Sequence, residues 1–97
     1  QQAYKDAANV PLEIGMISYE IFDLAYIAAT KGNQNLITDG IIAAINARAA
    51  VKAAFLNVRI NLSGIKDESY VADLKAQMTQ IESELDEKEA SILALYK

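Results

Sequence analysis

Apolar residues recur at helical spacing along almost the whole chain, and they divide it into three long segments. In residues 10–31 they alternate at intervals of four and three, as in a helix packing seam: Val10, Ile14, Ile17, Ile21, Leu24 and Ala28. Before this segment, residues 1–8 predict a helix fragment that ends near Pro11, because proline is disfavoured inside a helix but accepted in its first turn. Asn9 is then the expected N-cap of the helix over residues 10–31, and Lys31-Gly32-Asn33 is its expected end.

Residues 33–62 predict one central helix, which is rich in alanine, isoleucine and leucine and free of proline. At about 100° per residue its side chains form four rows. The first row, which we call the small-amide stripe, consists of Asp39, Ala43, Asn46, Ala50, Asn57 and Asn61. The row on the opposite side carries the basic residues Arg48, Lys52 and Arg59. The two flanks between these rows are apolar, one bulky (Ile42, Ile45, Leu56, Ile60) and one small (Gly40, Ala44, Ala47, Val51, Ala54, Val58).

Because both flanks of the central helix are apolar, we expect neighbouring segments to cover most of its circumference. The small-amide stripe then has two interpretations. It either packs closely against another helix, with a few amides hydrogen-bonded across the seam, or it holds a polar ligand. Periodicity by itself favours packing, and any amide buried there needs a partner, because an orphaned one costs about 1–3 kcal/mol.

The last segment predicts an amphipathic helix from Glu68 to Tyr96, with Asp67 as its N-cap. One narrow seam runs along it at intervals of three and four, interrupted by a lysine: Val71, Leu74, Met78, Ile81, Leu85, Lys88, Ile92 and Leu95. The other faces are charged, as in residues 82–89 (ESELDEKE). The segments together predict an all-α fold in a single domain spanning residues 1–97, an antiparallel helical bundle of three long helices plus an N-terminal helix fragment.

Composition excludes several classes of function. The chain has no histidine and no cysteine, so it lacks the commonest metal ligand, the commonest general base and the Glu-x-x-His motif of di-iron bundles. We therefore expect no bound metal, and we interpret Glu13, Glu20 and Asp23 as a solvated face in preference to an acid–base or metal site. The net charge of −4 and the pI of about 4.6 argue against a nucleic-acid partner.

The charges and apolar seams of the chain also bear on its membrane association, its cellular location and its oligomeric state. No segment reaches the roughly 18 uncharged apolar residues of a membrane span, since Arg48, Lys52 and Arg59 interrupt the longest candidate, so we expect no membrane partner. The absence of cysteine fits a reducing compartment, and we expect a cytoplasmic location. The chain begins at Gln1 within a helix-like run, as a piece of a longer polypeptide would. Large apolar surfaces rarely remain exposed to solvent, so we expect a homo-oligomer, in the simplest case a dimer.

Four local patterns resemble the cyclodeaminase family, the folate-processing domain of formiminotransferase-cyclodeaminase. They are Val10-Pro11-Leu12-Glu13, Lys31-Gly32-Asn33 followed by Asn35 and Asp39, Asn57-Val58-Arg59-Ile60-Asn61-Leu62, and Ile65-Lys66-Asp67. Their order and spacing match as well, and the run from Asn57 to Asp67 is the most specific part. The family's domain is longer and carries a Gly-rich segment in its first half that this chain lacks, so the resemblance is to the second half of that domain.

The resemblance implies an all-helical, dimeric domain that acts on tetrahydrofolate derivatives. Members convert 5-formiminotetrahydrofolate to 5,10-methenyltetrahydrofolate with release of ammonia. Similar stand-alone proteins hydrolyse or form the methenyl bridge, as methenyltetrahydrofolate cyclohydrolase does, and nothing in the sequence separates the two reactions. A different class of function also fits the pattern: a non-catalytic helical oligomerisation module, with the last helix as a coiled-coil-like arm and the small-amide stripe as a dimer seam.

Together with the resemblance, the small-amide stripe gives Asp39 as the candidate catalytic residue, since it is the only acid on the central helix. Its carboxyl group can assist the departure of ammonia or stabilise a methenyl cation, or it can simply suit the first turn of the helix, where the dipole favours anions. The candidate substrate-binding residues are Asn35, Asn57, Arg59 and Asn61. Arg59 suits the carboxylates of a folate tail, a dimer surface or a salt bridge to a neighbouring helix. The asparagines suit the edge of a pterin or hydrogen bonds across a helix seam.

Overall fold

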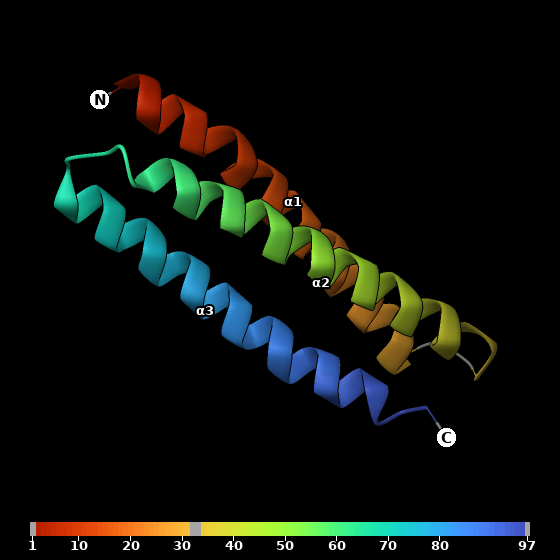
Figure 1. Cartoon of the computed structure of the whole chain (residues 1–97). Helices are drawn as coiled ribbons and strands as arrows, with labels where there is room; N and C mark the ends of the chain where they lie inside the picture. Colours follow the sequence, from red (N-terminus) through yellow and green to blue (C-terminus); the bar gives the residue numbers. More distant parts are fainter. Residues whose placement is uncertain (1, 32–33, 97) are drawn as a thin grey trace.

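A computed structural model of the chain describes residues 2–31 and 34–96, and the side chains of residues 34 and 35 lie outside this description. It contains three helices (Figure 1): α1 (Gln2–Lys31), α2 (Gln34–Leu62) and α3 (Glu68–Leu93). Successive helices run in opposite directions along a body of 50 × 18 × 16 Å. No strand occurs in the described residues, and the predicted all-α fold with three long antiparallel helices is confirmed.

The predicted break at Pro11 is wrong, because α1 runs through this residue without interruption. A proline inside a helix removes one backbone hydrogen bond and costs about 3 kcal/mol. Pro11 is itself buried in the helix contact, so burial contributes to offsetting this cost. The start of α1 also contacts the residues around the start of α3: Lys5 pairs with Asp67 at 3.1 Å and lies 4.7 Å from the centroid of the Tyr70 ring, although exposed contacts of this kind contribute at most about 1 kcal/mol each. Asn9 is not an N-cap but accepts a hydrogen bond from the Tyr70 hydroxyl at 3.4 Å. The predicted N-terminal fragment is therefore part of α1.

Helices α1 and α2 approach closely because small residues line their contact. A side chain at Gly15 would place its first carbon 2.3 Å from the Phe55 ring, and one at Gly40 would place it 3.0 Å from Ala29. The buried line of α1 consists of Ala8, Pro11, Gly15, Ser18, Phe22, Ala25 and Ala29. The small flank of α2, which is buried along its whole length, forms the other side of this contact. The hairpin of α1 and α2 is thus a tightly packed two-helix layer.

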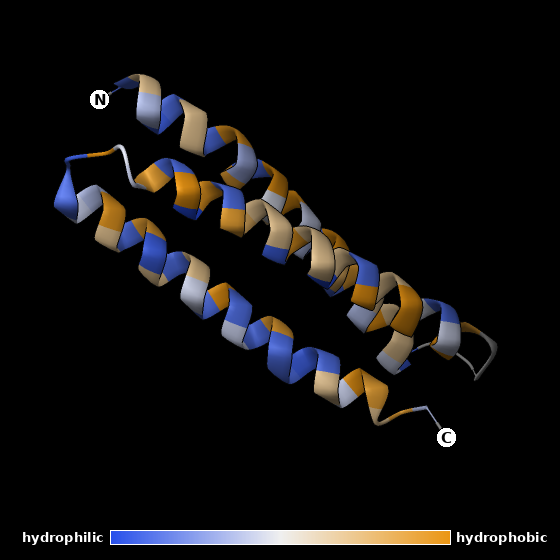
Figure 2. Cartoon of the chain, in the orientation of Figure 1, coloured by the Kyte–Doolittle hydropathy of each residue, from blue (hydrophilic) through white to orange (hydrophobic). Residues whose placement is uncertain are grey.

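Helix α3 joins the hairpin through the narrow seam predicted for it. The buried seam residues are Leu74, Met78, Leu85 and Ile92, and the other seam positions are half-buried. Asp67 caps the helix as predicted, accepting a hydrogen bond from the backbone N–H of Tyr70 at 3.2 Å. The helix ends at Leu93, three residues before the predicted Tyr96. In Figure 2 the ribbon of α3 is mostly blue, the colour of hydrophilic residues, whereas orange and tan, the colours of apolar residues, prevail along α2.

One side of the hairpin is uncovered in the single chain. The row predicted as a packing seam of α1 is exposed, by 61% at Val10, 56% at Ile17 and 68% at Leu24. Helix α1 packs instead through the adjacent line of small residues, since these let two backbones approach more closely than isoleucines do. The prediction that neighbours cover both flanks of α2 is wrong for the same reason: the small flank is buried, whereas the bulky flank is exposed.

The uncovered side lies opposite α3. Helix α1 contacts α3 through Tyr19 and Asp23, and α2 contacts it through Arg48 and Arg59. At about 100° per residue, the exposed row of α1 and the small-amide stripe of α2 both fall on the other side of the hairpin. We call the surface that these two rows form the bare face. Its members are Val10, Ile14, Ile17, Ile21, Leu24 and Ala28 of α1 and the small-amide stripe of α2.

By length and hydropathy alone, the segment Leu36–Leu62 of α2 is apolar enough to cross a membrane, so the predicted absence of such a segment is not confirmed. The core helices of water-soluble proteins pass the same test. Helix α2 is buried on one side only: its small flank packs against α1 and its basic residues are paired with acids on α3, and 39% of the apolar window is buried.

Candidate functional site

Three of the predicted site residues lie on the bare face. The side chains of Asp39 and Asn57 are exposed and that of Asn61 is half-buried. Because α2 begins at Gln34, Asp39 lies in its second turn, where the helix dipole has less influence than in the first. The position of Asp39 thus gives less support to a purely electrostatic role at the helix start. Asn35, the fourth predicted residue of this group, has its side chain outside the described part of the structure.

The carboxylate and the amides lie at opposite ends of α2. Eighteen residues separate Asp39 from Asn57, which is about 27 Å at a rise of 1.5 Å per residue. No single ring system can touch both within one chain. The described part of the chain also encloses no pocket. At the far end, the Asn61 side-chain amide donates a hydrogen bond to the backbone carbonyl of Asn57 at 2.9 Å, so one of its two N–H groups is already used.

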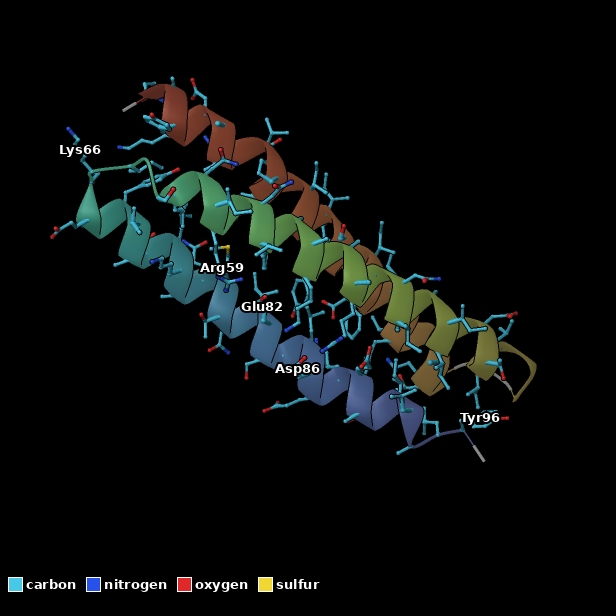
Figure 3. The ribbon with its side chains drawn as sticks, viewed as in Figure 1. Arg59, Lys66, Glu82, Asp86 and Tyr96 are labelled. Carbon is cyan, nitrogen blue, oxygen red and sulfur yellow. The ribbon has the colours of Figure 1, made fainter. Side chains whose placement is uncertain are left out.

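Arg59 lies on the α3 side of the helix, as its position opposite Asp39 predicts. Its guanidinium makes a two-pronged contact with the Glu82 carboxylate, in which Nη1 donates to Oε2 at 3.2 Å (Figure 3). The hydrogen bond to Glu82 raises the pKa of Arg59 above its usual value. The Glu82 side chain is only 16% exposed, so a folate carboxylate at this position would have to displace a largely buried partner. Among the roles considered for Arg59, the geometry favours the salt bridge between helices.

The other basic residues of α2 extend this contact into an ionic ladder, formed by Arg48, Lys52 and Arg59 of α2 with Glu82, Asp86 and Glu89 of α3. Arg48 donates to Asp86 at 2.9 Å and lies 3.6 Å from Glu89. The partners of α3 run in the opposite order to those of α2, as antiparallel helices require. The Arg48 hydrogen bond lowers the pKa of Asp86. The ladder fixes the position of α3 along the hairpin.

A second polar cluster joins α3 to α1 around Lys88, the residue that interrupts the apolar seam. Its ammonium group lies 2.8 Å from Asp23 and 5.6 Å from the ring centroids of Tyr19 and Tyr26. The hydrogen bond to Asp23 raises the pKa of Lys88. The Tyr19 hydroxyl donates to Glu84, and burial followed by this hydrogen bond raises the pKa of Tyr19. The cluster satisfies its own charges and presents no open position to a ligand.

Sequence reasoning did not find the partners of the ladder. Residues 82–89 were described only as part of the charged faces of the last helix, and the structure shows that two of these acids, Glu82 and Glu89, are half-buried and paired. The signal was present in the spacing: basic residues along one side of α2 and acids at similar intervals along α3. Of the acids on α1, Glu13 and Glu20 are exposed as predicted, whereas Asp23 belongs to the Lys88 cluster.

Comparison with known protein families defines the class of protein to which this bundle belongs. The chain matches the formiminotransferase-cyclodeaminase family model over residues 1–80. It therefore belongs to this family, and the resemblance drawn from the four local patterns is confirmed. The matched region contains α1, α2 and both rows of the bare face.

Two curated relatives give the closer context. The methenyltetrahydrofolate cyclohydrolase of Methylorubrum extorquens is 40% identical over 73 residues, which cover 75% of this chain and 35% of that protein. The formimidoyltransferase-cyclodeaminase of Gallus gallus is 30% identical over 95 residues, which cover 98% of this chain and 18% of that protein. The chain thus spans about a third of the first relative and less than a fifth of the second. Both relatives are named as enzymes of folate one-carbon metabolism.

Proposed function

We propose that this chain is part of a folate-processing enzyme that converts 5-formiminotetrahydrofolate to 5,10-methenyltetrahydrofolate with release of ammonia. The observation that carries the proposal is the family match over residues 1–80. The small-amide stripe supports it, because the stripe holds one carboxylate and several amides on an otherwise apolar surface. A flat, nitrogen-rich ring system offers hydrogen-bond donors and acceptors for such amides.

The proposed reaction needs charge and proton control at one carbon atom. N10 of the folate attacks the formimino carbon, and a tetrahedral adduct forms between N5 and N10. The amino group then takes up a proton and leaves as ammonia, and a methenyl cation delocalised over N5 and N10 remains. A carboxyl group beside this carbon can deliver the proton, and the resulting carboxylate stabilises the cation. Asp39 is the group we assign to this role.

The assignment requires that water be kept away from Asp39 during the reaction. Charge stabilisation is much stronger in a water-excluded site than at an open surface. In the single chain Asp39 is exposed. The proposed site is therefore complete only when another layer covers the bare face.

Methenyltetrahydrofolate cyclohydrolase activity is the second candidate, and the higher identity of 40% to an enzyme of that name favours it. This reaction involves the same carbon. Water attacks the methenyl carbon, the adduct loses a proton, and one carbon–nitrogen bond breaks to leave a formyl group on the other nitrogen. A carboxylate in the position of Asp39 would accept the proton from water, so one residue type serves both candidates.

One assay separates the two candidates and tests both. The purified chain is incubated with 5-formiminotetrahydrofolate and, separately, with 5,10-methenyltetrahydrofolate, while ammonia and the methenyl chromophore are followed. Ammonia release together with a rising methenyl absorbance supports the cyclodeaminase reaction. A falling absorbance without ammonia supports the cyclohydrolase. If neither signal changes at high protein concentration and the chain leaves the chromophore unperturbed, the proposed function is wrong.

A further inference from the structure

The family match ends inside α3. It covers residues 1–80, so the proximal half of α3, residues 68–80, lies within it, and the distal half, residues 81–93, lies outside it. All three acids of the ionic ladder belong to the distal half, and so do the α3 members of the Lys88 cluster. The charged contacts of α3 with the hairpin are therefore features of this chain beyond the region that the family model matches.

The net charge of the chain resides in α3. Residues 1–62 contain five acids and five bases, whereas α3 contains seven acids and two bases, a net charge of −5. Five of these acids lie in the distal half, where Lys88 is the only base. The last turn of α3 has no basic residue to balance the helix dipole. The distal half is thus poorly suited to form a helix on its own, because short helices depend on packing.

Like charges follow one another along both rows of the ionic ladder. On α3, Glu82, Asp86 and Glu89 are four and three residues apart, and on α2 Arg48 and Lys52 are four apart. Like charges at these spacings face one another and destabilise an isolated helix. In the docked state Asp86 lies 2.9 Å from Arg48 and 3.7 Å from Lys52. Docking therefore replaces repulsion within each row by attraction between the rows.

The apolar contact of the distal half is interrupted. Leu85 and Ile92 are buried, but Lys88 takes the seam position between them and reaches Asp23 of α1 at 2.8 Å. The hairpin, by contrast, is packed so closely that a side chain at a glycine of its contact would overlap a neighbour. The distal half depends on ion pairs to a degree that the hairpin does not.

We propose that the distal half of α3 is an electrostatic latch, which docks on the hairpin while its acids are paired with the basic row of α2 and opens as a unit when these pairs are screened. The proximal half stays docked, because the Asp67 cap and the short connection over residues 63–67 hold it. Salt reaches the ladder, since the side chains of Arg48 and Asp86 are 33% and 54% exposed. Screening weakens both the attraction in the docked state and the repulsion in the open state, so both effects favour opening.

Opening changes the support of α2 at a defined place. The ladder runs from Arg59 with Glu82 to Arg48 with Glu89, so the distal half points toward the start of α2. Asp39 lies further along in this direction, on the opposite side of the same helix. With the latch open, α1 is the one described helix that still packs on this part of α2. An effect on turnover at Asp39 rests on the proposed function, whereas the opening itself does not.

Hydrogen exchange of the backbone amides tests the latch without any folate. The unmodified chain is compared at about 10 mM and about 1 M NaCl, between which the Debye length falls from about 30 Å to about 3 Å. We expect exchange in residues 81–93 to become about ten-fold faster or more, through local opening. Residues 68–80 of the same helix are the internal control and should keep their rate relative to α2. An equal response in both halves of α3, or no response in the distal half, would overturn the latch.

A charge reversal and its rescue test the ion pairs. Arg48→Glu places an acid beside Asp86 and Glu89, so the distal half should exchange about ten-fold faster even at low salt. Adding Asp86→Arg re-creates the pair with opposite signs and should restore slow exchange. Lys75→Glu, at an exposed position of the proximal half, makes the same change in net charge and is the matched control.

The outcomes of these variants separate the latch from a general effect of charge. If Lys75→Glu opens the distal half as much as Arg48→Glu does, or if Asp86→Arg fails to rescue, the latch is refuted. Should Arg48→Glu prevent folding, the salt comparison on the unmodified chain decides by itself. A chain that shows the expected exchange but leaves methenyltetrahydrofolate unperturbed would support the latch while the proposed function fails.

Discussion

The two sides of the α1–α2 hairpin differ in how far they are buried within the chain. On one side, α3 supplies a narrow apolar seam, the ionic ladder and the Lys88 cluster. The other side, the bare face, has exposed isoleucines and a row of small and amide side chains, and no helix in the described part of the chain lies over it. On the charged side the polar groups are therefore already paired within the chain, whereas on the apolar side the side chains stay exposed unless another layer covers them.

This difference assigns separate roles to the polar groups of α2. Arg48, Lys52 and Arg59 are satisfied by acids of α3, so their part is structural. Asp39 and Asn57 lie on the opposite side and are exposed. Polar groups that a fold leaves uncommitted on an apolar surface are the ones available to a ligand or to a second copy.

The largest expected effect separates the interior of the hairpin from its outer edge. Phe55 is fully buried, whereas the next residue, Leu56, is 60% exposed. We expect Phe55→Ala to lower the free energy of unfolding by about 3–5 kcal/mol, through lost burial and the cavity that remains. Leu56→Ala should change it by less than about 0.5 kcal/mol. Urea unfolding followed by circular dichroism measures both, and similar losses for the two variants would refute the assignment of the interior.

A smaller effect is expected from breaking the ionic ladder. Arg59→Ala removes the two-pronged partner of Glu82 and leaves a carboxylate that is only 16% exposed, with Lys52 4.0 Å away. We expect a loss of about 1–2 kcal/mol in the free energy of unfolding, because a largely buried charge is left poorly paired. Lys75→Ala on the exposed surface of α3 is the control. If both variants unfold at the same urea concentration as the unmodified chain, the ladder does not hold α3 in place.

Low pH should weaken the contacts that hold α3 on the hairpin and so lower the stability of the fold. The pKa of Asp67 is lowered by the backbone N–H of Tyr70 and then by Lys5, and that of Asp86 is lowered by Arg48. A lowered folded-state pKa stabilises the native state fully above the unfolded value of about 4, and this contribution is lost as the pH falls through the folded-state value. We expect the melting temperature to fall below about pH 4. The double variant Asp67→Asn/Asp86→Asn should have a lower melting temperature at neutral pH and lose less of it in acid. If its melting temperature depends on pH as that of the unmodified chain does, these two carboxylates are not the cause of the acid sensitivity.

The smallest change in protomer stability is expected on the bare face. Ile17→Gln replaces a half-exposed side chain with a good helix former, so the free energy of unfolding at low concentration should change by less than about 0.5 kcal/mol. In the homodimer that the resemblance leads us to expect, the same variant should raise the dissociation constant about ten-fold or more, since each protomer would lose an apolar contact with its partner. Sedimentation velocity over a concentration series measures this constant. Unchanged association would remove Ile17 from the interface.

Periodicity was sufficient to predict the three helices, the Asp67 cap and the seam of α3, because each depends on local spacing. It was insufficient at Pro11, which is buried in the packing of α1, because the gain from tertiary packing is not visible in the local penalty that the sequence does show. It also failed to say which apolar row packs inside the chain, since hydrophobicity measures the gain from burial but not how closely two backbones can approach.

The candidate site was predicted only in part. The stripe that holds Asp39, Asn57 and Asn61 follows from the helical repeat, and so does the position of Arg59 on the other side. The Glu82 partner of Arg59 depends on the register between α2 and α3, which the spacing of charges hinted at but did not fix. Whether Asp39 is covered depends on a second molecule or layer, and a single sequence does not specify that.

The most direct test of this account compares two aspartates on the two sides of the molecule. Asp39→Asn removes the carboxylate of the bare face, and Asp73→Asn removes an exposed one on α3. With turnover of the methenyl bridge as the readout, we expect Asp39→Asn to lower kcat by about a hundred-fold or more, as for the loss of an acid–base group. Asp73→Asn should keep the rate of the unmodified chain. Full turnover by Asp39→Asn would contradict the assignment of the bare face as the functional side.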